Sequence, residues 1–253
     1  MKVFTVLFLA HVLGDYYFQP EGLARRKERG QGWALLHCLI YAAAMAASLL
    51  LLGGGHIWAA AVCAGTHLII DVVKQFILIR SAKAGALTVK GERAAFCADQ
   101  ALHLLIILGA SLWVTDSFEL AVPPYMDSFG RLTGLDAYKL TAYAALALAV
   151  MKPANVFIRR MAVNRKPDGE PDGLAPESVR MGRYIGSLER LLVAALLSLA
   201  QYGSIALVFT AKSVARFKQL DDRRFAEYYI FGTLLSATVA VGAFLLLKYF
   251  GTL

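Results

Sequence analysis

The sequence predicts an all-α membrane protein, a polytopic helix bundle with about seven apolar helices. Of its 253 residues, 58% are hydrophobic and 17% are charged, and the mean hydropathy is +0.56. This is far more apolar than an average soluble domain. The apolar residues gather in seven runs, most of which reach the roughly 17 to 25 residues that a membrane-spanning helix needs. These runs cover residues 3–18, 33–52, 57–79, 94–114, 137–158, 189–211 and 225–250.

The first run is the weakest candidate for a span. Gly14 and Asp15 interrupt it, so we expect a short or tilted segment. Its apolar core leads into the polar sequence DYYFQPEG without a small-residue cleavage site. Because a secretory signal peptide carries such a site, we expect the segment to remain in the mature protein.

The basic residues predict the orientation of the helices. Loops one and three carry clusters of Lys and Arg, whereas loop two has none and loop four is mainly acidic. By the positive-inside rule, loops one and three are cytoplasmic, and the N-terminus and loops two and four are external. The fifth loop is also basic, which places it inside. The last loop contradicts simple alternation, because it too is basic. A re-entrant segment or an interfacial amphipathic stretch would resolve this conflict. The residues concerned are Lys212, Arg216, Lys218, Arg223 and Arg224.

The chain divides at an acidic loop. Residues 1–115 hold the first four apolar runs, and residues 116–136 form the acidic external loop. Residues 137–253 hold the remaining membrane helices, with a basic polar loop near 159–188. In this second half, polar residues such as Glu189 and Arg190 are expected at helix ends, where snorkelling and ion pairs account for them.

Small residues in the second half suggest a second interpretation. Gly182, Gly186 and Gly232 would let helices pack closely and form a homodimer face or a substrate vestibule. The formal charge of +8 is spread over separate loops rather than one stripe, so no nucleic-acid partner is expected. The three cysteines lie singly in apolar runs and are expected to be structural, which excludes a disulfide framework or zinc ribbon. They are Cys38, Cys63 and Cys97.

Histidine and aspartate recur at helical spacing inside the first four runs. Three His/Asp pairs are four residues apart, which places both side chains of a pair on one helix face. One further histidine lies in the second run. Ionisable groups at membrane depth are costly and normally face a bundle interior where they have partners. We therefore predict one polyvalent metal site near the cytoplasmic side. Its predicted ligands are His11, Asp15, His37, His67, Asp71, Asp99 and His103.

The ligand types favour a divalent metal bound by imidazole and carboxylate. Zinc fits best, with manganese or iron as alternatives. Seven ligands exceed one tetrahedral shell, so the surplus serves either a second metal or the outer partners that orient imidazoles. Each residue alone has a simpler explanation, such as a helix contact or an ion pair. Gln100 and Gln19 are candidate outer partners, and His56, beside an external glycine-rich turn, is expected to be solvated.

Two residues are predicted to take part in catalysis, Asp71 and Lys74. Lys74 follows Asp71 by three residues on the same face. It would either neutralise that carboxylate or orient an anionic substrate. A metal-bound water at an open position would supply the nucleophile of a hydrolase.

Three functions remain open from the residues alone. The first is a metal-dependent hydrolase near the cytoplasmic leaflet, acting on a small molecule or a lipid. The second is a metal-ion or proton-coupled transporter that uses the same residues as a transit site. The third is a structural or sensory protein whose metal only locks the bundle.

The motifs HVLGDYYFQ, HLIIDVVKQ and FCADQALH, with a lone His37, resemble the bacterial membrane family called domain of unknown function 3307. The resemblance covers about residues 7 to 107. It implies a multi-pass protein of the bacterial inner membrane and gives no substrate. The first half is also loosely similar to membrane-bound metal-dependent hydrolases, which implies metal and hydrolysis.

Overall fold

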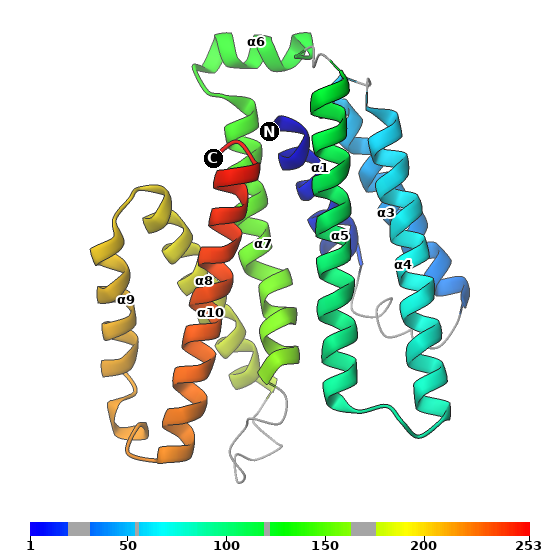
Figure 1. The fold of residues 1–253 in the computed structure, drawn as a ribbon. Coiled ribbons are helices and arrows are strands. Elements are labelled where there is room, and N and C mark those ends of the chain that lie inside the picture. The colour runs from blue at the N-terminus through cyan, green and yellow to red at the C-terminus, as the bar shows by residue number, and fades with distance from the viewer. Residues whose placement is uncertain (20–30, 54–55, 119–121, 163–175) are drawn as a thin grey trace. The chain divides into compact units, whose positions relative to one another are not determined.

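The structure is a computed structural model that describes residues 1–19, 31–53, 56–118, 122–162 and 176–253. All regular structure within these ranges is helical (Figure 1). The prediction of an all-α bundle is therefore confirmed.

The expected number of spanning helices is not met. In the described part of the chain, five helices are long and apolar enough to cross a membrane, rather than seven. The other two apolar runs do not form such helices. The five are α3 Gln31–Leu52, α4 Ile57–Lys83, α5 Val89–Ser117, α7 Ala137–Ala162 and α10 Arg223–Phe250.

The first α-helix is short because the chain changes from α-helical to π-helical geometry around Gly14 and Asp15, the residues that interrupt the apolar run. An eleven-residue helix, α1 Lys2–Val12, passes into a π-helical turn, η1 Leu13–Tyr17. Helix α1 packs against α3 and α5, and α4 packs against the same two helices. Nine of the eleven α1 residues are buried. The first run is thus an inner helix of the bundle rather than a lipid-facing span.

The sixth run is broken into two helices, α8 Pro176–Ser198 and α9 Tyr202–Val214. At the break, Ala200 adopts a left-handed backbone conformation with φ of 55°. The Gln201 amide donates to the Leu196 carbonyl at 2.8 Å, and the Ala200 amide donates to the Leu197 carbonyl at 3.1 Å. This bonding pattern is a Schellman motif, which ends a helix and satisfies its last carbonyls. Helix α9 then packs back on α8.

The described residues form two compact units. The first consists of Met1–Ala145 with Tyr249–Leu253, and the second of Leu146–Lys248. The acidic segment of the first unit contains a short helix, α6 Pro124–Thr133. Proline in its first turn and Gly134 at its left-handed C-terminal end explain where α6 begins and ends.

Helix α4 shows how a bundle helix faces both protein and lipid. Its buried residues recur at a spacing of three or four, which is one face of a helix. Large apolar residues such as Ile69 and Phe76, each 62% exposed, cover the opposite face, as expected for contact with lipid. The buried residues are Ala59, Ala60, Cys63, His67 and Asp71. The one buried face therefore carries two of the predicted ligands.

The second unit contains a buried polar network that the sequence did not predict. Arg190 lies in the middle of α8 rather than at its end, because α8 begins at Pro176, and it is 3% exposed. Its guanidinium donates to the Val150 carbonyl and to Asn155, each at 2.6 Å. Pro153 lies inside α7 and removes the backbone donor that the Ala149 carbonyl would otherwise receive. The Arg190 bond to Val150 lies one residue further along the same turn.

The glycines expected to bring helices together in the second half do not do so within the chain. A Cβ atom added at Gly182 or Gly232 would meet nothing within 4 Å, and one at Gly186 would meet the Arg190 side chain at 3.3 Å. Gly186 thus leaves room for the guanidinium. The homodimer remains a prediction.

The turn at Ala200 generates a stability prediction. A left-handed conformation costs an L-residue about 1 kcal/mol that glycine avoids. Ala200→Gly should therefore raise the free energy of unfolding in detergent by up to about 1 kcal/mol. Ala206→Gly is the matched control, because Ala206 is an exposed residue in the interior of α9, where glycine should lower it by about the same amount. Equal destabilisation by both substitutions would contradict the left-handed turn.

Candidate metal centre

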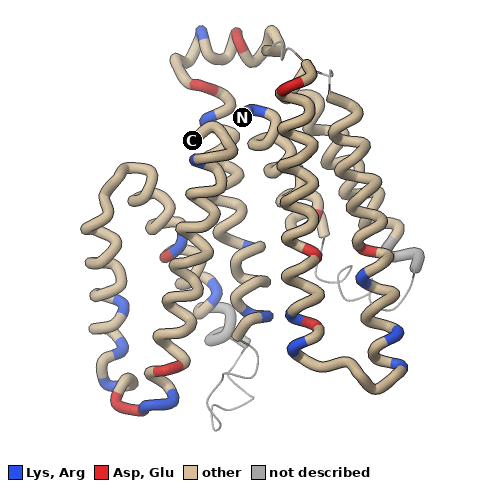
Figure 2. The backbone as a smooth tube through the Cα atoms, viewed as in Figure 1, with Lys and Arg blue, Asp and Glu red and all other residues tan. Residues whose placement is uncertain are grey.

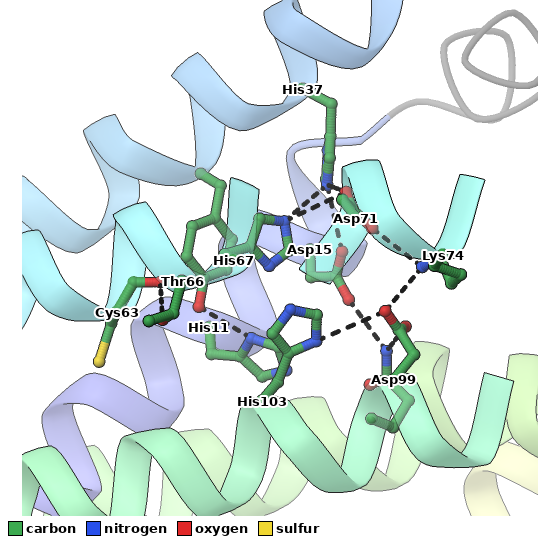
Figure 3. Close-up of polar contacts among 12 residues, drawn as sticks. His11, Asp15, His37, Cys63, Thr66, His67, Asp71, Lys74, Asp99 and His103 are labelled. Atoms are coloured by element: carbon green, nitrogen blue, oxygen red, sulfur yellow. Dashed lines mark hydrogen bonds and ion pairs between the residues drawn. The ribbon is translucent and has the colours of Figure 1, made fainter. Parts of the chain in front are cut away.

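Four helical elements of the first unit direct polar side chains into one cluster (Figure 3). Helix α4 contributes His67 and Asp71, each 3% exposed or less. Helix α5 contributes Asp99 and His103, which are buried to a similar degree. Helix α3 contributes His37, which is fully buried. The i, i+4 spacing of the α4 and α5 pairs places both members toward the same neighbours.

The π-helical turn supplies the remaining carboxylate of the innermost group. The Phe18 amide donates to the Leu13 carbonyl at 2.8 Å, a five-residue step that widens the turn around Asp15. Gly14 allows this turn to approach α3. A Cβ atom at Gly14 would lie 3.1 Å from the Tyr41 ring and 3.2 Å from the Ala44 side chain. The contact of Gly14 with α3 therefore positions the Asp15 carboxylate.

Two imidazoles and two carboxylates converge at the centre of the cluster. The His37 Nε2 atom lies 3.1 Å from His67 Nε2, 3.3 Å from Asp15 Oδ1 and 3.6 Å from Asp71 Oδ2. The His67 Nε2 atom lies 3.5 Å from the same Asp71 oxygen. Neighbouring ligands of a tetrahedral zinc ion, with bonds of about 2.1 Å, lie about 3.4 Å apart. The four measured separations, 3.1 to 3.6 Å, are close to this value.

Hydrogen bonding alone does not satisfy this arrangement. The His37 Nε2 atom carries at most one hydrogen, yet a second imidazole nitrogen and two carboxylates face it. A cation would satisfy all of these groups at once. The donor set of imidazole and carboxylate suits zinc, manganese or iron.

The charges of the cluster also point to a cation. The Lys74 ammonium donates to Asp71 Oδ1 at 2.9 Å and to Asp99 Oδ1 at 2.8 Å. The predicted neutralisation of Asp71 is thus seen, and it extends to Asp99. With Asp15, three carboxylates lie beside the Lys74 ammonium in the described part of the chain. A divalent cation would add positive charge to this cluster.

Gln100 joins the carboxylates to one another. Its side-chain amide donates to Asp99 Oδ2 at 2.9 Å and to Asp15 Oδ2 at 3.4 Å. Its carbonyl accepts from the Tyr16 hydroxyl at 2.7 Å. Gln100 therefore holds the Asp15 oxygen that does not face His37, as outer partners of a metal centre usually do.

The other two predicted histidines lie beside the four converging atoms. The His103 ring centroid is 4.5 Å from that of His67, and His103 Nδ1 is 3.9 Å from Asp99 Oδ1. The His11 ring is 5.4 Å from His103, and its Nδ1 atom is 3.1 Å from the Tyr41 hydroxyl. All seven predicted ligands thus belong to one cluster, but three of them do not join the innermost group. These are His11, Asp99 and His103.

Tyr41 is an important residue that the sequence analysis missed. Its ring stacks on His67 with a centroid distance of 3.7 Å and an interplanar angle of 5°. The buried Nδ1 atoms of His37 and His67 have no hydrogen-bond partner in the described part of the chain, so stacking takes over the orienting role for His67. The available signal was spacing, because Tyr41 follows His37 by four residues on α3.

Cys38 also lies beside the cluster, although only a structural role was predicted for it. A ligand atom from each of Cys38, His67 and Asp71 lies within 4.8 Å of the others. Asp15, His37 and His67 form the second grouping of this kind in the described residues. His56 is outside the cluster and only 3% exposed, which corrects the expectation that it is solvated.

Residues 3–127 match the sequence profile of a family described as "Protein of unknown function (DUF3307)". The resemblance inferred from residues 7 to 107 is thereby confirmed. No curated protein and no solved structure matches the chain. The looser likeness to metal-dependent hydrolases is not shown by these comparisons.

The close approach at Gly14 generates a binding prediction. Gly14→Ala should push η1 away from α3, displace Asp15 and weaken zinc binding by about tenfold or more, as losses of outer partners do. Competition with a chromophoric chelator measures this affinity. Gly109→Ala is the control, because a Cβ atom there meets nothing within 4 Å. Unchanged affinity in Gly14→Ala would contradict the positioning role of this contact.

Proposed function

We propose that this chain, whose residues 3–127 belong to the DUF3307 family, holds one divalent cation within its helix bundle and uses it for hydrolysis near the cytoplasmic leaflet. The observation that carries the proposal is the convergence of two imidazoles and two carboxylates on His37 and His67, with separations of 3.1 to 3.6 Å. His37, His67, Asp15 and Asp71 are the proposed ligands. Zinc is the proposed metal, since its ligand preferences match this set.

The proposed chemistry needs a nucleophile and a way in for the substrate. A zinc ion lowers the pKa of a bound water to about 7 and so supplies hydroxide at neutral pH. The exposure of the cluster rises from 0% at His37 and His67 to 13% at Asp15 and 25% at Lys74. Substrate would therefore approach from the side of Asp15 and Lys74.

Lys74 is proposed to hold an anionic group of the substrate. Two of its three N–H donors are used by Asp71 and Asp99, which fix the ammonium at the accessible side of the cluster. The third donor has no partner among the described residues and is available for a phosphate or carboxylate oxygen. An ester of phosphate in a lipid or small molecule is the substrate class that fits these groups.

Transport is the second candidate, and the enclosure of the imidazoles favours it. His37 and His67 are fully buried among apolar helices, as ligands of a transit site would be. The same residues would then release the ion on the other side without forming a chemical product.

Metal content tests the centre itself. Protein purified in detergent should contain about one equivalent of metal, and His37→Gln and His67→Gln should each lose it because a tetrahedral shell loses a ligand. Elemental analysis by mass spectrometry measures the content. His56→Gln is the control that should retain the metal, since His56 lies outside the cluster. Equal metal content in all three variants would refute the site, provided that each elutes as folded protein.

Turnover and flux separate the two functions. Zinc-loaded protein should hydrolyse bis(p-nitrophenyl) phosphate or a phospholipid, and Asp71→Asn should slow this by about a hundredfold or more. Asp116→Asn, at an exposed site near the end of α5, should leave the rate unchanged. Zinc flux into sealed vesicles that depends on Asp71, with neither compound hydrolysed, would instead establish transport. Unfolding on metal removal without either activity would indicate a structural metal.

A further inference from the structure

The start of α7 and the end of α10 lie beside the N-terminus in the first unit. The Met1 ammonium donates to the Gly251 carbonyl, and the hydroxyls of Thr5 and Thr252 are 3.2 Å apart. The Thr252 hydroxyl also donates to the Tyr138 carbonyl at 2.9 Å. These residues therefore share one side of the membrane, which the positive-inside rule makes the external side.

The lengths of α7 and α10 place their other ends on the opposite side. Helix α7 has 26 residues and α10 has 28, which correspond to about 39 and 42 Å at 1.5 Å per residue. Both exceed the roughly 30 Å hydrocarbon core. The end of α7 and the start of α10 are therefore cytoplasmic. The chain between them must begin and end on the cytoplasmic side.

Helices α8 and α9 occupy this interval and turn back on themselves. Helix α9 has 13 residues, about 20 Å, which is too short to cross the core. The reversal at Leu199–Gln201 satisfies its own carbonyls through the Schellman motif. The two arms are joined by the Lys212 ammonium, which donates to Glu189 at 2.6 Å. A hairpin whose turn carbonyls are bonded internally and whose arms are joined by an ion pair can enter a bilayer without crossing it.

We propose that α8 and α9 form a re-entrant hairpin that enters from the cytoplasmic side, and that the basic segment after α9 lies against anionic lipid headgroups there. No residue of α9 is buried, and Leu207 is 68% exposed, so bilayer lipid is the occupant of its apolar surface. Phe217, 70% exposed, lies between Arg216 and Lys218, a combination that suits the membrane interface.

The charge distribution supports this arrangement independently of the helix lengths. Helix α7 ends with Arg159 and Arg160, and α10 begins with Arg223 and Arg224. Figure 2 shows Lys and Arg gathered at the turn between α9 and α10. With the hairpin re-entrant, every one of these groups is cytoplasmic, and the last loop no longer contradicts the positive-inside rule.

Sidedness is tested by labelling single cysteines with a membrane-impermeant maleimide. Lys218→Cys should label in inverted vesicles and not in intact cells. Leu132→Cys, in α6 of the external segment and 86% exposed, should show the opposite pattern. The parent protein gives the background from its own cysteines. Labelling of Lys218→Cys and Leu132→Cys from the same side would overturn the re-entrant hairpin.

The lipid partner is tested by probes on the hairpin and its loop. A nitroxide attached at Leu207→Cys should be relaxed by oxygen and not by a water-soluble nickel chelate. If the nitroxide were protected from both reagents, protein would cover α9, and lipid contact would be overturned.

An environment-sensitive fluorophore at Phe217→Cys should brighten in vesicles containing phosphatidylglycerol compared with phosphatidylcholine alone. The double substitution Arg216→Gln and Lys218→Gln should remove this difference. Equal emission in both vesicles would overturn headgroup binding.

Discussion

The burial of three carboxylates among apolar helices is the constraint on which the first unit depends. An uncompensated charge in a membrane interior costs several kcal/mol, so the helices must bring compensating groups to the same place. Lys74 compensates one charge by bridging Asp71 and Asp99. The need to compensate the buried carboxylates accounts for the convergence of the helices on this cluster and for the burial of the first helix.

Much of this cluster could be predicted from sequence because the pairing is local. Residues four apart on a helix share a face whatever the tertiary fold, and a carboxylate in an apolar run needs a partner. The π-helical turn and the Tyr41 stack are different. They depend on how closely Gly14 approaches α3 and on the path of η1, which are properties of packing between helices. The division into an innermost group and two flanking histidines therefore required the structure.

The predicted number of membrane-spanning helices differs from the structure for a related reason. A hydropathy window measures length and apolarity, and residues 189–211 have both. The break at Ala200 depends on one left-handed residue, and alanine gives no turn signal. Arg190 and Glu189 were assigned to a helix end because the apolar run begins there, whereas α8 begins thirteen residues before Glu189. The start of the apolar run therefore differs from the start of α8, because the buried polar network lies inside this helix.

The two sides of the cluster differ in their access to solvent. Exposure within the cluster rises toward Asp15 and Lys74. In the opposite direction, from His11 toward the N-terminus, the buried residues of α1 are apolar except for Thr5. An ion that left the centre that way would lose its ligands without gaining new ones. The proposed hydrolase could meet its substrate on the open side in this state, whereas a transporter would need a second state in which helix α1 moves and opens the other side.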